Sequence, residues 1–187
     1  GIGANTFTIG AWTGQATING STGTDTLVAS GDFNFVLGAA SLAVSSGATV
    51  SFAGVEKARL TGGNSANTLD ASLFTGSVML FGLDGNDTLK GGKGASVLVG
   101  GNGSDNLSAG TGRSILIGGT GADTIAGGIA GTGSAKTMGR IGGKENLAAT
   151  GADALGQQRQ HLVQMRQSLH APGLDAGAKG LGQAAPD

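Results

Sequence analysis

Three aspartates recur at a regular interval that would bring carboxylates together in a repetitive fold. Asp87, Asp105 and Asp123 are eighteen residues apart, and Ser96 and Ser114 occupy the midpoints between them. All three aspartates lie in glycine-rich segments, whose turns expose backbone carbonyl oxygens. Calcium is a hard ion that takes roughly six to eight oxygen ligands in flexible geometry, so this combination points to calcium chemistry. This pattern raises the question of why a carboxylate appears only at every second of these positions, with serine at the others.

The elements that would position these residues are repeats of nine residues. Residues 82–126 divide into five consecutive copies: GLDGNDTLK, GGKGASVLV, GGNGSDNLS, AGTGRSILI and GGTGADTIA. The fourth position is always glycine, and the eighth is always Leu or Ile. The glycine-rich half of each copy turns the chain, and the last three residues form a short strand whose middle side chain points inward. Two copies complete one coil, so eighteen residues advance the chain by one inter-strand spacing of ~4.8 Å.

This periodicity predicts an all-β fold, a right-handed parallel β-roll or β-helix solenoid stabilised by the stacking of its coils. The aspartates would then stack along one edge of the solenoid, and Ser96 and Ser114 would stack along the opposite edge. That arrangement answers why only alternate copies carry a carboxylate. The predicted inward stripe consists of the residues at the eighth position: Leu89, Leu98, Leu107, Leu116 and Ile125.

Two of the copies, GGNGSDNLS and GGTGADTIA, resemble the RTX, or haemolysin-type, calcium-binding nonapeptide GGxGxDxUx, in which U is a large apolar residue. GLDGNDTLK departs from this motif at its second position, and the two serine copies depart at their sixth. The resemblance is strong over about a quarter of the chain. It implies a secreted or surface protein of bacteria in which each calcium ion lies between turns of successive coils.

Carried over to this chain, the resemblance implies about two Ca2+ ions, one between the turns of Asp87 and Asp105 and one between those of Asp105 and Asp123. Carboxylates ~5 Å apart repel each other by ~0.8 kcal/mol in water and by ~3 kcal/mol at an effective dielectric constant of 20, so a cation is needed between them. Extracellular calcium modules bind at ~0.1 to 1 mM, which would fill these sites only outside a cell. The predicted ligands are Asp87, Asp105, Asp123, Gly85, Gly101, Gly103, Gly119 and Gly121.

Upstream of the regular copies, residues 4–27 align with residues 66–89 at a constant offset of 62, which indicates an internal duplication. Asn5 and Asn67 stand where the motif has aspartate and are predicted to be turn residues, as is Asp84 at a third position. Asp25 keeps the motif but has no aspartate one coil away, so the turn interpretation is favoured there too. We expect irregular solenoid coils over 1–61, with apolar β-formers clustered at Phe33, Phe35, Leu37, Val50, Phe52 and Val55.

Composition limits the classes of function. The formal net charge is −1, with 12% charged residues, so no basic surface for nucleic acid is expected. No apolar run approaches the length of a membrane span, and there is no cysteine. No HExxH, GxSxG or Ser, His and acid arrangement is present, so we expect no catalysis. His161 and His170 are nine residues apart, which does not suit metal binding on a helix face.

Two further regions carry predictions of their own. In the serine copies, Val97, Val99, Ile115 and Ile117 flank the inward leucines and should face outward together, where a protein partner or neighbouring domain could pack; β-propensity alone is the other explanation. After residue 126 the register is lost. Residues 127–187 are predicted to be a Gly/Ala-rich, mostly irregular tail with one candidate helix at 153–170.

These observations give three hypotheses. The first is a calcium-binding structural module of a secreted or cell-surface bacterial protein, composed of coils over 62–126 and folding when calcium binds, with an adhesive role as one option. The second is a C-terminal folding module detached from an RTX-type secreted enzyme. The third is a calcium-free β-solenoid scaffold whose Asp and Asn side chains serve only the turns.

Overall fold

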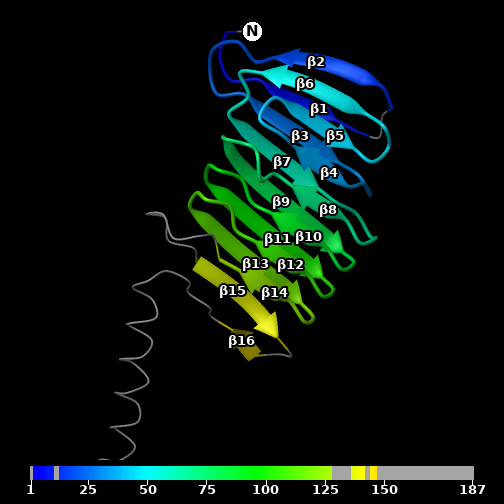
Figure 1. The fold of residues 1–187 in the computed structure, drawn as a ribbon, viewed down its shortest axis with the longest axis vertical. Helices are drawn as coiled ribbons and strands as arrows, with labels where there is room; N and C mark the ends of the chain where they lie inside the picture. Colours follow the sequence, from blue (N-terminus) through cyan, green and yellow to red (C-terminus); the bar gives the residue numbers. More distant parts are fainter. Residues whose placement is uncertain (1, 11–12, 128–135, 142–143, 147–187) are drawn as a thin grey trace, which may run out of the picture. The chain divides into compact units, whose positions relative to one another are not determined.

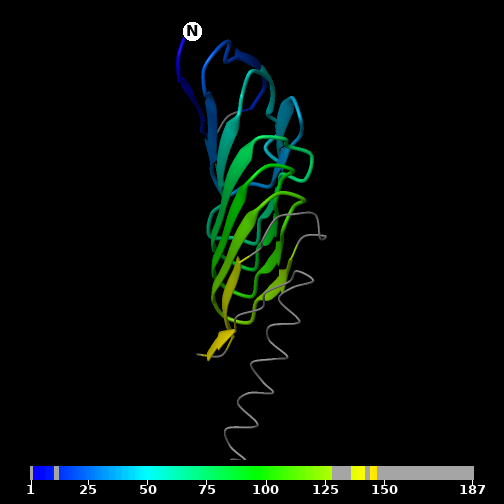
Figure 2. The same cartoon turned by 90° about the vertical axis from the view of Figure 1, so that its left-hand side faces the viewer.

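The computed structural model describes residues 2–10, 13–127, 136–141 and 144–146, all within one compact unit, Gly1–Gly151. Every regular element in these ranges is a β-strand, and none of them contains a helix long and apolar enough to cross a membrane. The chain winds back and forth between two stacked sheets (Figures 1 and 2), which confirms the predicted all-β parallel solenoid. The candidate helix at 153–170 and both histidines lie outside the described residues.

Each sheet has eight strands. The first sheet has the order β1 (Thr6–Ile9), β3 (Thr26–Ser30), β7 (Lys57–Thr61), β9 (Ser77–Asp84), β11 (Ser96–Asn102), β13 (Ser114–Thr120), β15 (Lys136–Ile141) and β16 (Lys144–Asn146). The second sheet has the order β14 (Thr124–Ala126), β12 (Asn106–Ser108), β10 (Thr88–Lys90), β8 (Thr68–Asp70), β4 (Phe35–Leu37), β5 (Ser41–Val44), β6 (Thr49–Ala53) and β2 (Gln15–Asn19). Neighbouring strands are parallel except at β4 with β5, β5 with β6 and β15 with β16.

The nonapeptide coils repeat every eighteen residues, as their sequence predicts. Leu98 pairs with Leu116 in the first sheet, and Leu89 pairs with Leu107 in the second. These four leucines are fully buried, and Ile125 in the last strand of the second sheet is partly buried. The stripe is therefore a continuous apolar core in which each coil covers the next.

Within each nonapeptide coil, the strand in the first sheet is longer than the strand in the second, which the uniform repeat did not reveal. The strands β10, β12 and β14 have the expected three residues, but β11 and β13 have seven each. Each of the longer strands continues through the glycine pair of the next copy, where Gly101 pairs with Gly119. Ser96 and Gly100 are buried along with Leu98. The prediction of one inward residue per copy is thus wrong for the first sheet, because its strand extends into the turn segment.

Upstream coils are longer and less regular. Thr26 pairs with Thr6 and with Lys57, so the coil between β3 and β7 has thirty-one residues. The additional length forms the antiparallel strands β4, β5 and β6 in the second sheet. The apolar clusters predicted there are in the core, with Phe35, Leu37, Val50 and Phe52 buried and Phe33 and Val55 partly buried. The first sheet also continues beyond residue 126, because β15 pairs in parallel with β13.

Turns between the sheets form two edges of the solenoid. We call the turns that lead from the first sheet to the second the aspartate edge, and the turns that return to the first sheet the serine edge. The duplicated segments fall on different edges, since β1 belongs to the first sheet whereas its counterpart β8 belongs to the second. Over the offset of 62 residues, the chain therefore passes from one sheet to the other an odd number of times. As a result, Asp25 lies on the serine edge and not with Asp87.

Candidate metal centre

The three predicted aspartates form a column on the aspartate edge. Each directly precedes a strand of the second sheet, and these strands pair in register, with Thr88 opposite Asn106 and Asn106 opposite Thr124. The aspartate side chains are almost completely buried, with exposed fractions of 1%, 1% and 7% for Asp87, Asp105 and Asp123. A column of buried carboxylates thus runs from one nonapeptide coil to the next.

One oxygen of each carboxylate is held by the main chain of the preceding coil. Oδ1 of Asp87 accepts a hydrogen bond from the backbone N–H of Asn67 at 2.7 Å. Oδ1 of Asp105 accepts from Asp87 N–H at 2.8 Å, and Oδ1 of Asp123 accepts from Asp105 N–H at 3.0 Å. These amides are a whole coil away, so the aspartates do more than close their own turns. The hydrogen bonds fix each carboxylate in one orientation.

The other oxygen of each carboxylate, Oδ2, is buried and has no hydrogen-bond partner among the residues that the structure describes. A buried carboxylate oxygen without a partner is unfavourable, because it has lost its water without replacement. Burial raises the pKa of Asp87 to about 6, and the neighbouring charge of Asp105 adds to this effect. Burial likewise raises the pKa of Asp105, with a further contribution from the charge of Asp123. The column is therefore arranged to receive a positive charge.

Glycines at the first position of each aspartate copy leave room beside these free oxygens. A Cβ atom on Gly82, Gly100 or Gly118 would lie 2.1 to 2.2 Å from Oδ2 of the aspartate five residues later. The same position on Gly100 would lie 2.5 Å from the carbonyl oxygen of Gly118, in the next coil. A carboxylate oxygen and a carbonyl oxygen therefore converge at each of the first two glycines. These three glycines were absent from the predicted ligands, although the repeated glycine at position one was the signal for them.

The five predicted glycine ligands all have positive φ angles: 104° for Gly85, 119° for Gly101, 132° for Gly103, 111° for Gly119 and 117° for Gly121. A Cβ atom on Gly103 would lie 1.9 Å from the carbonyl oxygen of Gly85, and one on Gly121 would lie 2.0 Å from that of Gly103. Glycine is thus required both by the backbone angle and by the close approach of successive coils. The carbonyl oxygens of Gly85, Gly101 and Gly103 each face the corresponding glycine of the next coil.

The donor set fits calcium. Every candidate ligand is an oxygen, and a site between two coils would combine two carboxylates with glycine carbonyls. No group of three or more His, Cys, Asp or Glu side chains in the described residues is suited to metal binding, so carbonyls would have to complete the shell. The atoms best placed are Oδ2 of Asp87, Asp105 and Asp123 and the carbonyl oxygens of Gly100 and Gly118.

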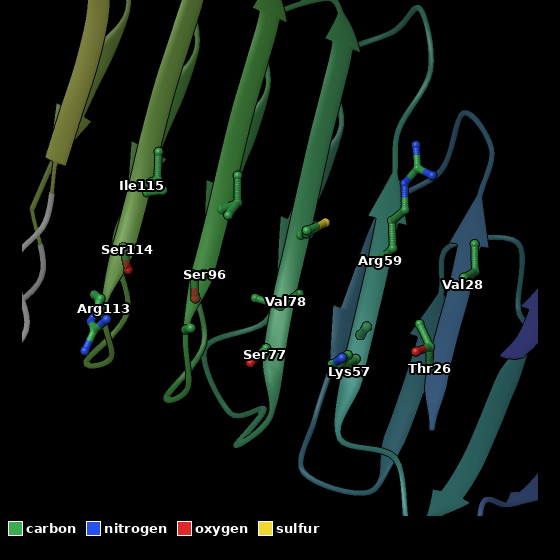
Figure 3. Close-up of a pocket in the computed structure, with 14 residues that line it drawn as sticks. Thr26, Val28, Lys57, Arg59, Ser77, Val78, Ser96, Arg113, Ser114 and Ile115 are labelled. Atoms are coloured by element: carbon green, nitrogen blue, oxygen red, sulfur yellow. The ribbon is translucent and has the colours of Figure 1, made fainter. Parts of the chain in front are cut away.

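In the nonapeptide coils, the serine edge has hydroxyl groups where the aspartate edge has carboxylates. Ser96 and Ser114 are each 2% exposed, and they begin neighbouring strands, as Figure 3 shows. The hydroxyl of Ser96 accepts a hydrogen bond from Gly92 N–H at 3.0 Å, and the hydroxyl of Ser114 donates to the carbonyl of Gly112 at 3.2 Å. A hydroxyl can donate and accept locally, whereas a carboxylate can only accept. Within the nonapeptide coils, the alternation of Ser and Asp thus confines the buried carboxylates to one edge.

Asn67 lies in a turn, as predicted, whereas Asp84 is the last residue of strand β9 and pairs with Asn102, so the turn prediction is wrong for Asp84. The carbonyl oxygen of the Asn67 side chain accepts from Gly63 N–H at 2.6 Å, and its amide group donates to Asp32 at 3.1 Å. Asp84 is exposed and accepts a hydrogen bond from the side chain of Asn102 at 2.7 Å. These bonds need no metal. Asn5 also lies in a turn, where its backbone N–H and its side-chain amide donate to Asp25 Oδ1 and the amide also donates to the carbonyl of Gly3 at 2.9 Å.

A groove of about 590 Å³ crosses the first sheet near the serine edge (Figure 3). Its lining includes exposed Met79 and Ile115 together with Val97. It also includes Arg59, whose guanidinium lies 5.0 Å from the centre of the Phe81 ring. The predicted outward patch is on this face, with Ile115 and Ile117 45% and 36% exposed and Val97 and Val99 partly exposed.

Comparison with protein families supports the interpretation of the repeat. A family model described as RTX calcium-binding nonapeptide repeat (4 copies) matches residues 17–40, 81–116 and 99–129. The matched residues include the whole aspartate column and also Asp25. No match was found among the curated proteins.

Proposed function

Because the chain carries the RTX calcium-binding nonapeptide repeat, we propose that it is a calcium-binding structural module of a secreted or cell-surface bacterial protein. The observation that supports this most strongly is the column of three buried aspartates, each with one carboxylate oxygen that has no partner. RTX repeats typically occur in secreted bacterial proteins, which favours an extracellular location where calcium is abundant.

In this proposal the chain's own residues prepare the site and calcium supplies positive charge. Backbone N–H groups orient the carboxylates, and the glycines at position one keep side chains away from the free oxygens. Leucines in the core hold successive coils in register. Because ligands from successive coils meet only in the folded state, calcium would stabilise that state selectively and couple folding to export. Two ions would occupy the two gaps in the column, one between Asp87 and Asp105 and the other between Asp105 and Asp123.

We further propose that the module is structural and not catalytic. The three aspartates of the column are held by main-chain hydrogen bonds, and the sequence offers no nucleophile paired with a base. A role as the folding module of a larger secreted enzyme is compatible with the same site. The two roles differ only in what the parent protein carries beside this segment.

The groove on the first sheet is the best candidate for a protein partner or a neighbouring domain. It combines apolar Val97 and Ile115 with exposed Lys57, Arg59 and Arg113 on a face that the calcium column does not use. An adhesive role of the module would depend on this face. The double substitution Val97→Ser with Ile115→Ser should weaken such an attachment while calcium binding remains unchanged.

The proposed function is tested by calcium titration of the purified protein, followed by circular dichroism and by native mass spectrometry. We expect β-structure to increase, or its thermal stability to rise, over ~0.1 to 1 mM calcium. Magnesium at the same concentration serves as the control, since it retains its water shell and requires octahedral geometry. A protein that is fully folded with chelator and unchanged by calcium would instead be a calcium-free scaffold.

A further inference from the structure

Asp25 occupies a second acidic site on the serine edge, away from the aspartate column. Its side chain is completely buried, and within the described part of the chain Oδ2 has no hydrogen-bond partner. Oδ1 accepts hydrogen bonds from the backbone N–H of Asn5 at 2.8 Å and from the Asn5 side-chain amide at 2.7 Å. The carboxylate is therefore fixed with one free oxygen, just as in Asp87.

The free oxygen of Asp25 meets a backbone carbonyl from the next coil. A Cβ atom on Gly20 would lie 2.5 Å from Asp25 Oδ2 and 1.8 Å from the carbonyl oxygen of Gly54. On the aspartate edge, a Cβ atom on Gly82 would lie 2.1 Å from Asp87 Oδ2 and 2.5 Å from the carbonyl oxygen of Gly100. The two glycines thus mark equivalent places, at which a carboxylate oxygen and a carbonyl oxygen converge.

Glu56 stands to Asp25 as Asp105 stands to Asp87, as the carboxylate of the next coil. Its Oε2 accepts a hydrogen bond from Asp25 N–H at 2.8 Å, as Asp105 Oδ1 accepts from Asp87 N–H at 2.8 Å. Glu56 also directly precedes β7, the strand that pairs with β3 after Asp25. In sequence Glu56 follows Asp25 by thirty-one residues, because the strands β4, β5 and β6 are inserted between them. A spacing of eighteen could not have identified this carboxylate.

Neither carboxylate is neutralised by a neighbouring base. Among the described side chains, the one ion pair within 4 Å joins Lys90 and Asp70, on a different part of the solenoid. Asp25 and Glu56 are joined through a hydrogen bond from the Asp25 main chain to the Glu56 carboxylate. A buried carboxylate with a free oxygen, an adjacent carboxylate and a converging carbonyl form an all-oxygen donor set suited to a hard divalent cation.

We propose that Asp25, Glu56 and the carbonyl oxygen of Gly54 bind a further calcium ion on the serine edge. This inference rests on the proposed calcium function of the chain and adds a site that the nonapeptide spacing does not predict. The ion connects the coil of β3 to that of β7 at the point where the inserted strands interrupt the regular period. Exposed Glu56 leaves room for water to complete the coordination shell.

The experiment counts calcium ions bound per chain by native mass spectrometry at saturating calcium, with circular dichroism to verify folding. Glu56→Gln retains an acceptor for Asp25 N–H but removes the charge, and it should bind one ion fewer than the wild type. Asp25→Asn should lose the same ion. Asp84→Asn is the charge-matched control, because Asp84 is exposed, and it should keep the full count. Asp105→Asn should lose ions from the column but retain the one at Glu56.

The possible outcomes separate this inference from the proposed function. A full count in Glu56→Gln, together with a reduced count in Asp105→Asn, would overturn the serine-edge site and leave the column intact. A wild-type chain that binds no calcium would overturn both. If Asp25→Asn does not fold, Glu56→Gln alone decides, since its effect on the hydrogen bond is small.

Discussion

Each aspartate of the column divides its two oxygens between different tasks. Oδ1 accepts a hydrogen bond from the coil before it, and Oδ2 is buried without a partner. The first interaction is structural and would survive replacement of the carboxylate by an amide. The second requires a cation and would not. Substitution of Asp by Asn therefore separates the two roles at a single position.

Asp105→Asn should have opposite effects with and without calcium. Without calcium, removal of a buried charge from the middle of the column should stabilise the protein by roughly 1 to 3 kcal/mol. With calcium, the stabilisation by the ion should largely disappear, because Asp105 borders both gaps. Thermal unfolding with chelator and with millimolar calcium measures both effects. The control Asp84→Asn changes the same charge on an exposed side chain, and equal behaviour of the two variants would contradict the role of the column.

The raised pKa of Asp87 predicts a dependence on pH. Burial holds this pKa at about 6 in the folded protein, above the value near 3.9 of an exposed aspartate. The folded state therefore binds the proton more tightly, so metal-free stability should be highest in acid and should fall as pH rises through about 6. Calcium affinity should instead increase as pH rises, because protons compete with calcium for the same oxygens. Midpoints of unfolding measured on both sides of this pKa, with chelator, test the sign, and Asp87→Asn should flatten the profile.

At the scale of the elements, Leu83 is a strained residue near the end of strand β9. Its φ is 84°, and it pairs with Gly101, which has a φ of 119° at the same place in the next coil. A leucine in left-handed conformation costs roughly 1 to 2 kcal/mol, so Leu83→Gly should stabilise the protein by about 1 kcal/mol after the entropy cost of glycine. Leu73→Gly is the control, since Leu73 is 58% exposed and has an ordinary φ. It should be neutral or destabilising in the same urea titration.

The elements also show what the sequence could and could not predict. From the period of nine we could predict the coil length, the inward leucines and the placement of Asp105 and Ser96 on opposite edges. Each of these properties repeats together with the strand pairing. The period failed where the chain departs from it. Glu56 could not be placed beside Asp25, since the inserted strands β4, β5 and β6 change the number of residues in that coil. Likewise, the duplication did not reveal that its two copies face opposite edges. Similarity between two segments does not show how many times the chain between them passes from one sheet to the other.

At the scale of the whole molecule, buried charge is distributed unevenly along the solenoid. The nonapeptide coils stack three buried aspartates, whereas the inserted strands pack apolar Phe35, Leu37, Val50 and Phe52 with no buried carboxylate between them. Stacking of the nonapeptide coils must overcome repulsion that calcium would remove. The inserted strands have no such requirement. Calcium bound in the aspartate column should therefore stabilise the nonapeptide coils more than the inserted strands β4, β5 and β6.

Hydrogen exchange followed by mass spectrometry can test this difference in one protein. With chelator, amides of β11, β12 and β13 should exchange faster than those of β4 and β6, because local opening relieves carboxylate repulsion in the nonapeptide coils. Addition of calcium should slow exchange in β11 to β13 by tenfold or more, since a tenfold change corresponds to ~1.4 kcal/mol, a modest stabilisation for a bound ion. Asp105→Asn should show little calcium response in the same peptides. Equal protection of both regions under both conditions would mean that the solenoid unfolds as one unit and that its acidic column does not control local stability.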